Sequence, residues 1–87
     1  MTTPIQPFWF KQRQCKAVPV EGRQMLEVSG PNLTPAFIHV RREDSRWKVG
    51  LRKSADGDDV ATADSDKPSE HAAWDAAFEL YRTALVV

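Results

Sequence analysis

The stretch from Ser69 to Leu85 carries a stripe of large apolar side chains, and this stripe restricts the fold more than any other feature of the sequence. Its residues recur at spacings of three and four, the period of an amphipathic helix, and they are Trp74, Ala77, Phe78, Tyr81 and Leu85. Such a helix is roughly 25 Å long at about 1.5 Å per residue. A stripe this wide must be covered by another layer, and only the strand-like segments before it can supply one.

The start of this helix is predicted at Ser69, whose hydroxyl is a good N-cap. Glu70 then places a carboxylate near the positive end of the helix dipole. Asp66 is the alternative cap if the helix begins one turn earlier. On the solvent side, Glu79 and Arg82 have the spacing of an i,i+3 ion pair.

The clearest pair of strands covers residues 36–42 and 46–53, with a short polar connection between them. Apolar and polar residues alternate cleanly in both, so their faces can be assigned. The side chains predicted to point inward are Ile38, Val40, Trp47, Val49 and Leu51. Those predicted to point outward include Phe37, His39, Arg41, Arg46, Lys48 and Arg52.

The remaining strands are less regular. Residues 24–29 alternate like the return strand of a hairpin, with Met25 on the outward face. The stretch from Trp9 to Val18 is strand-like with a bulge or tight turn near residues 12–14, and Pro19 ends it. Pro35 limits the following strand to the residues after it, and residues 60–63 form a short edge strand.

These elements predict an α+β fold, an antiparallel meander sheet of four to five strands with one C-terminal helix packed on one face. Residues 1–7 are predicted to be a disordered N-terminal tail, and residues 8–87 a single domain. The predicted core consists of Phe10, Leu26, Val28, Ile38, Val40, Trp47, Val49, Leu51, Trp74, Phe78, Tyr81 and Leu85.

The location is predicted to be cytoplasmic, without a membrane partner. The N-terminus has neither the basic start nor the apolar run of a secretion signal, and no apolar run approaches the roughly 20 residues that span a bilayer. The single cysteine, Cys15, allows no internal disulfide, which fits a reducing compartment.

The sequence predicts no catalytic residue, no cofactor site and no metal site. His39 and His71 share no identifiable partner, and Cys15 has no local base. The acidic turn at residues 56–59 lacks the closing glutamate of a calcium-binding EF-hand loop. An enzymatic function would regain support from a deep pocket that joined Cys15 or His39 to a carboxylate.

Charge is distributed unevenly along a chain whose net charge is zero. Up to Lys53 there are ten basic residues against four acidic, and from Ser54 onward two basic against eight acidic. Asymmetry of this kind is a hint about partners. The candidate binding surface is the outer sheet face, formed by Phe37, His39, Arg41, Arg46, Lys48 and Arg52.

One sequence resemblance concerns the same face. The run from Arg46 to Arg52, followed by residues 72–77, resembles the strand and helix of plant ethylene-response-factor DNA-binding domains and of phage-integrase arm-binding domains. The resemblance implies a three-stranded sheet inserted into a DNA groove, with Arg46 and Arg52 as contacts. It covers under half of the chain, and Asp58, Asp59 and Asp64 flank the last strand where a phosphate backbone would lie.

The function expected from the sequence is a small non-enzymatic binding or interaction module. The partner is expected to be a protein or a second copy, held by charge-complementary surfaces. The alternative is nucleic-acid binding through the basic outer face of the sheet, which is less favoured because the overall charge is neutral.

Overall fold

The computed structural model describes residues 6–31, 33–65 and 69–86, with side chains described as far as Ala84. Most of the predicted tail at residues 1–7 lies outside the described residues. In chain order the elements are α1 (Phe8–Gln12), β1 (Lys16–Pro19), β2 (Met25–Gly30), β3 (Leu33–Glu43), β4 (Arg46–Arg52), β5 (Asp59–Ser65), α2 (Glu70–Tyr81) and a π-helical turn (Arg82–Val86).

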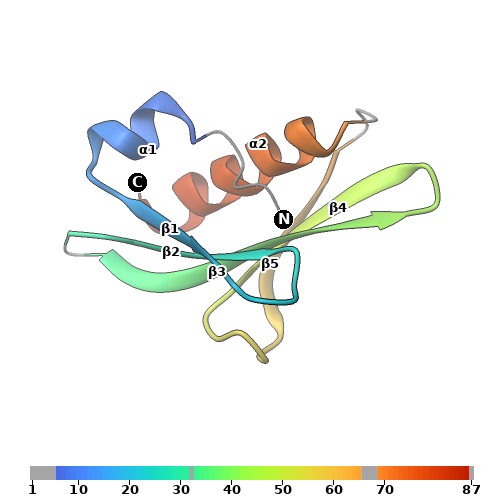
Figure 1. Cartoon of the computed structure of the whole chain (residues 1–87), viewed down its shortest axis with the longest axis horizontal. Coiled ribbons are helices and arrows are strands. Elements are labelled where there is room, and N and C mark those ends of the chain that lie inside the picture. Colours follow the sequence, from blue (N-terminus) through green and yellow to red (C-terminus); the bar gives the residue numbers. More distant parts are fainter. Residues whose placement is uncertain (1–5, 32, 66–68, 87) are drawn as a thin grey trace.

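The five strands form one antiparallel sheet in the order β1-β2-β3-β4-β5, and α2 packs across one face of it (Figure 1). The predicted α+β meander with a C-terminal helix is therefore confirmed. None of the described helices is long and apolar enough to cross a membrane.

Helix α2 begins at the predicted cap. The Ser69 hydroxyl accepts a hydrogen bond from the backbone N–H of Ala72 at 3.1 Å, and Glu70 occupies the first turn. The helix is amphipathic because its small and large apolar residues fall on one stripe. The buried residues of that stripe are Ala73, Trp74, Ala77, Phe78 and Tyr81.

The first helix was not predicted. The stretch from Trp9 to Val18 was expected to be one interrupted strand, but its first part is helical as α1 and only Lys16–Pro19 pairs with β2. The predicted tight turn is present, and Gln14 adopts a left-handed backbone there (φ 58°). This turn carries the chain from α1 on the helical side of the sheet to the edge position of β1 (Figure 1).

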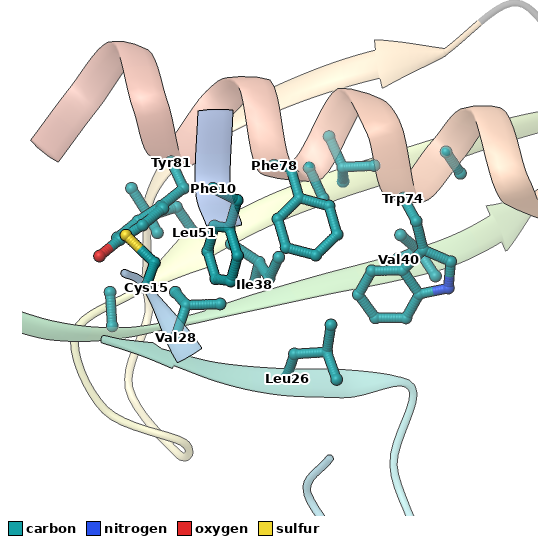
Figure 2. Packing of buried hydrophobic residues seen from close by; sticks show 14 of the residues in the cluster. Phe10, Cys15, Leu26, Val28, Ile38, Val40, Leu51, Trp74, Phe78 and Tyr81 are labelled. Carbon is teal, nitrogen blue, oxygen red and sulfur yellow. The ribbon is translucent and has the colours of Figure 1, made fainter. Parts of the chain in front are cut away.

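The core lies between the sheet and the two helices (Figure 2). Eleven of the predicted core residues are buried, and the side chain of the twelfth, Leu85, lies outside the described part of the chain. Phe10 of α1 meets Phe78 of α2 edge to face, with ring centroids 5.0 Å apart. The two ends of the chain are therefore joined through aromatic contacts in the core.

Three further details differ from the prediction. Strand β3 begins before Pro35, which is tolerated because Pro35 lies in an irregular part of the β2–β3 ladder where no partner is paired with it. Strand β5 extends over Asp59–Ser65 and is longer than predicted. Met25 points to the outer face as predicted but is buried there, opposite His39.

Candidate functional site

The six residues of the predicted surface lie together on the face of the sheet opposite α2. We call this the outer face. In the β3–β4 register Phe37 pairs with Arg52 and Arg41 pairs with Lys48, while Val40 and Val49 between them face the helix. His39 lies opposite Gly50, and Arg46 lies opposite Glu43 at the end of the hairpin. The geometric part of the prediction, that these side chains share a face, holds.

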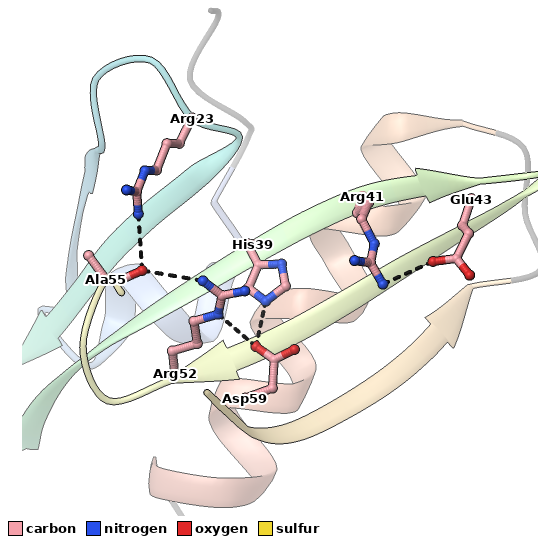
Figure 3. A network of polar contacts seen from close by, with 7 residues as sticks. All are labelled: Arg23, His39, Arg41, Glu43, Arg52, Ala55 and Asp59. Carbon is pink, nitrogen blue, oxygen red and sulfur yellow. Dashed lines mark hydrogen bonds and ion pairs between the residues drawn. The ribbon is translucent and has the colours of Figure 1, made fainter. Parts of the chain in front are cut away.

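The centre of the outer face is a polar cluster that joins three strands (Figure 3). The Nε2 atom of His39 donates to Oδ1 of Asp59 at 2.6 Å, and Nε of Arg52 donates to the same oxygen at 2.9 Å. The imidazole reaches β5 by passing over Gly50, where a side chain would collide with it. A histidine on β3 thus contacts a carboxylate two strands away because the strand between them carries a glycine.

A β-bulge places Asp59 on this face. Leu51 pairs with Ala61 and Arg52 pairs with Asp59, so Val60 is an extra residue without an opposite partner. In a regular strand, with Val60 paired opposite Arg52, Asp59 would have the same parity as Ala61 and would face the helix. The bulge therefore turns Asp59 outward, toward His39 and Arg52.

The two donors determine the ionisation of Asp59. Its partial burial alone would raise its pKa, but the hydrogen bonds from His39 and Arg52 and their charges hold the pKa below its ordinary value. The carboxylate form is therefore favoured in the folded protein. A negative charge fixed at this position neutralises the basic side chains around it.

The loop after β4 is attached to the same cluster. Arg52 and Arg23 both donate to the backbone oxygen of Ala55, at 3.3 Å and 3.0 Å (Figure 3). Arg23 also pairs with Asp56 at 2.8 Å. The β1–β2 turn and the β4–β5 loop, far apart in sequence, are thereby held together on the rim of the outer face.

Carboxylates neutralise most of the predicted basic side chains. Glu43 is 2.9 Å from Arg41 and 3.6 Å from Lys48, and Asp59 binds Arg52. Among the described residues, Arg46 forms no ion pair. The strand positions of the outer face hold five cations against four carboxylates, namely Lys16, Arg41, Arg46, Lys48 and Arg52 against Glu27, Glu43, Asp59 and Asp64. The surface is a mosaic of both signs.

A hollow of about 150 Å³ lies beside His39 and Asp59, with Arg41, Lys48, Thr62 and Asp64 among the residues that line it. Small-molecule sites usually enclose about 300–1,000 Å³, so this hollow is too small to hold most substrates. Within the described part of the chain, no group of three or more histidine, cysteine, aspartate or glutamate side chains could hold a metal ion.

The other residues considered from the sequence lie elsewhere. Cys15 is buried in the core on the opposite side of the sheet, and burial raises the pKa of its thiol, which disfavours the reactive thiolate. His71 is on α2, 3.5 Å from Asp75. His39 does meet a carboxylate, but Cys15 is not part of that cluster.

Sequence reasoning missed Asp59 and Gly50. A glycine inside an otherwise regular strand is a known sign of close approach by another group, and Gly50 carried that sign. Asp59 had no comparable sign because its orientation depends on the bulge at Val60.

Comparison with known proteins finds no match: no family model, curated protein or solved structure is significantly similar to the chain. The five-stranded sheet also exceeds the three strands implied by the resemblance to DNA-binding domains. Of the two arginines which that resemblance singles out, Arg52 is bound to Asp59.

Proposed function

We propose that the chain is a non-enzymatic protein-binding module that acts in the cytoplasm. Its contact surface is the outer face, with Phe37, His39, Arg41, Arg46, Lys48 and Arg52 as the contacting residues. One observation carries the proposal: within the described residues no second layer covers this face of the sheet, whereas α1 and α2 cover the other face (Figure 1).

The pattern of charge supports a protein as the partner. Side chains of both signs lie on the outer face, and ion pairs hold several of them in fixed positions. Phe37 is half-buried between Glu27 and Arg52 and adds an aromatic group to the centre of this mosaic. Fixed charges of both signs complement a protein surface, which also carries both, and they favour specificity in association.

The same pattern makes nucleic acid the less favoured partner. A phosphate backbone presents only negative charge and is bound by cations that are free to replace its counterions. Here Asp59 and Glu43 already occupy Arg52, Arg41 and Lys48. Self-association of a basic face with an acidic region of a second copy is less favoured too, because the cations of the outer face are already paired with carboxylates of their own chain.

A pull-down experiment tests the proposal by comparing the proteins that bind to the wild-type chain with those that bind to a variant of the outer face. Immobilised wild-type chain and an Arg46→Glu/Phe37→Ala variant are exposed to an extract of the source cells, and bound proteins are identified by mass spectrometry. Lys11→Glu, on α1 at the opposite side of the sheet, is the matched control for surface charge. We expect at least one protein that the wild type and the control retain and the variant does not. Identical sets from all three chains would contradict the outer face as the contact surface.

Two measurements address the other partners. Filter binding to mixed-sequence DNA and RNA near about 50 mM salt would show affinity that falls steeply with added salt if several phosphates were contacted. Sedimentation at low and high salt would show a larger species at low salt if copies associated through opposite charges. We expect no salt-dependent binding in the first and a monomer in the second.

A further inference from the structure

Strand β5 forms an open edge of the sheet. It is the last strand in the order and spans seven residues, Asp59–Ser65, with neither proline nor lysine. The opposite edge, β1, is protected in the usual ways: it has four residues, starts with Lys16 and ends with Pro19. The two edges in the described part of the chain therefore differ, and β5 is the longer one, without a proline or lysine to hinder pairing with another strand.

An apolar hollow lies beside this edge. It has a volume of about 290 Å³, and Ala63 of β5 and Ala76, Glu79, Leu80 and Thr83 of the C-terminal helical segment line it. Ala61 and Ala63 are partly buried and point toward the α2 side of the sheet. A strand added next to β5 would direct every second side chain into this hollow, because side chains alternate between the faces of a strand.

The bulge at Val60 limits the usable edge. Regular pairing with β4 runs from Ala61 to Ser65, so an added strand of about the same length fits. Val60 itself is 55 % exposed and marks one end of the site. The apolar hollow adjoins this run of the edge at Ala63.

Charge distinguishes between two possible partners for this edge, a second copy of the chain and a basic peptide segment. Asp58 just before β5 and Asp64 within it form no ion pair with the described residues, and β5 has no basic residue. Glu79 on the wall of the hollow is paired with Arg82 and adds no free charge. A second copy paired through its own β5 would bring the same carboxylates, whereas a basic segment would complement them.

We infer that the β5 edge binds an extended peptide segment of a partner protein as a sixth strand. The segment has apolar side chains at alternate positions, which fill the hollow against Ala76 and Leu80, and lysine or arginine residues that face Asp64. This is strand addition, in which backbone hydrogen bonds supply affinity and the hollow supplies specificity. The inference rests on the proposal that the chain binds protein, but it concerns a surface separate from the outer face.

The test uses a displayed library of short random peptides, selected against the full chain. Selected peptides should share apolar residues at every second position together with lysine or arginine. Titration of a peptide into nitrogen-labelled chain should shift the backbone amide NMR signals of residues 61–65 and slow their hydrogen exchange. Leu80→Lys should weaken binding by about tenfold or more, because it removes apolar contact and adds like charge.

Two further variants serve as controls for the effect of Leu80→Lys on peptide affinity. Val18→Lys introduces a lysine at an exposed apolar side chain on the other edge of the sheet and should leave affinity unchanged. Thr83→Lys changes an exposed residue of the hollow and should weaken binding even if Leu80→Lys is poorly folded.

Three outcomes would overturn the inference. A library that yields no binders shows that the edge does not accept peptides. Binding of proteins to the outer face is then tested separately by the cell-extract experiment. Binders that shift residues 37–41 and 46–52 instead of 61–65 show that the chain binds protein through the outer face alone. If the sedimenting species becomes larger as the chain concentration rises, and the amide signals of residues 61–65 shift at the same time, a second copy occupies the edge.

Discussion

The imidazole of His39 lies in the space that a β-carbon at Gly50 would occupy. Strand β4 separates the strands of His39 and Asp59, so the contact between them exists only because this position has no side chain. The bond of His39 to the polar cluster therefore depends on the absence of a side chain at Gly50.

Replacing Gly50 by alanine should therefore displace His39 from Asp59. The new methyl group would collide with the imidazole and lie 2.8 Å from Oδ1 of Asp59. Forcing a group into occupied space typically costs about 1–3 kcal/mol of unfolding free energy. Urea denaturation of the single variant measures this cost.

A double-mutant cycle identifies the cause. If the collision with His39 is responsible, Gly50→Ala should cost much less in a His39→Ala background, since contacting residues couple by about 0.5–3 kcal/mol. Equal costs in both backgrounds would mean that His39 is not what the methyl group meets.

Asp59→Asn should change how stability depends on pH. The pKa of Asp59 is lowered in the folded state from the ordinary value of 3.8, so its pairing stabilises the fold above that value. This contribution is lost as pH falls below 3.8 and through the lowered pKa. The difference in unfolding free energy between wild type and variant should thus be largest near neutral pH and shrink in acid.

The pH comparison needs a carboxylate control. Asp58→Asn removes a neighbouring carboxylate that forms no ion pair with the described residues, so it reports the effect of charge alone. Acid and urea titrations of the three chains provide the data. A gap between wild type and Asp59→Asn that stays constant from neutral pH into acid would refute the linkage.

Phe78→Ala should strongly destabilise the domain. Phe78 is fully buried and contacts Phe10 edge to face, so truncation leaves a cavity where the two helices meet. Truncation of a buried phenylalanine costs about 3–5 kcal/mol. Phe8→Ala, at a side chain 78 % exposed, is the matched control and should stay within about 0.5 kcal/mol of wild type in the same denaturation assay.

Ser69→Ala should destabilise α2 by about 0.5–2 kcal/mol, because the N–H of Ala72 loses its acceptor. Ser69→Gly should cost only a few tenths of a kcal/mol, since glycine is tolerated at the cap. Thermal melts followed by circular dichroism can rank the three chains. Equal melting temperatures for the serine and alanine chains would show that the cap bond contributes nothing.

The sequence predicted the helix, the faces of the strands and most of the core because burial repeats with a fixed period in each element. The stripe containing Trp74 and Phe78, and the alternation around Val49, are signals of this kind. They also placed the six outer-face residues together.

Elements without a period were missed. Helix α1 has five residues, too few to repeat a pattern, and its aromatic run resembles a strand. The contact between His39 and Asp59 requires the Val60 bulge, and a single inserted residue leaves no mark on local composition. Helix α1 and the contact between His39 and Asp59 thus depend on tertiary packing.

The meander order has a consequence for how the chain acquires its structure. Each strand pairs with the next one in sequence, so hairpins can close one after another at small entropic cost, which favours rapid folding. Much of the apolar side of the growing sheet nevertheless stays exposed to water until α2 packs, because the short α1 buries only Phe10 and α2 follows the last strand. During synthesis, an unfinished chain would expose an apolar surface that is fully covered only when its last helix packs.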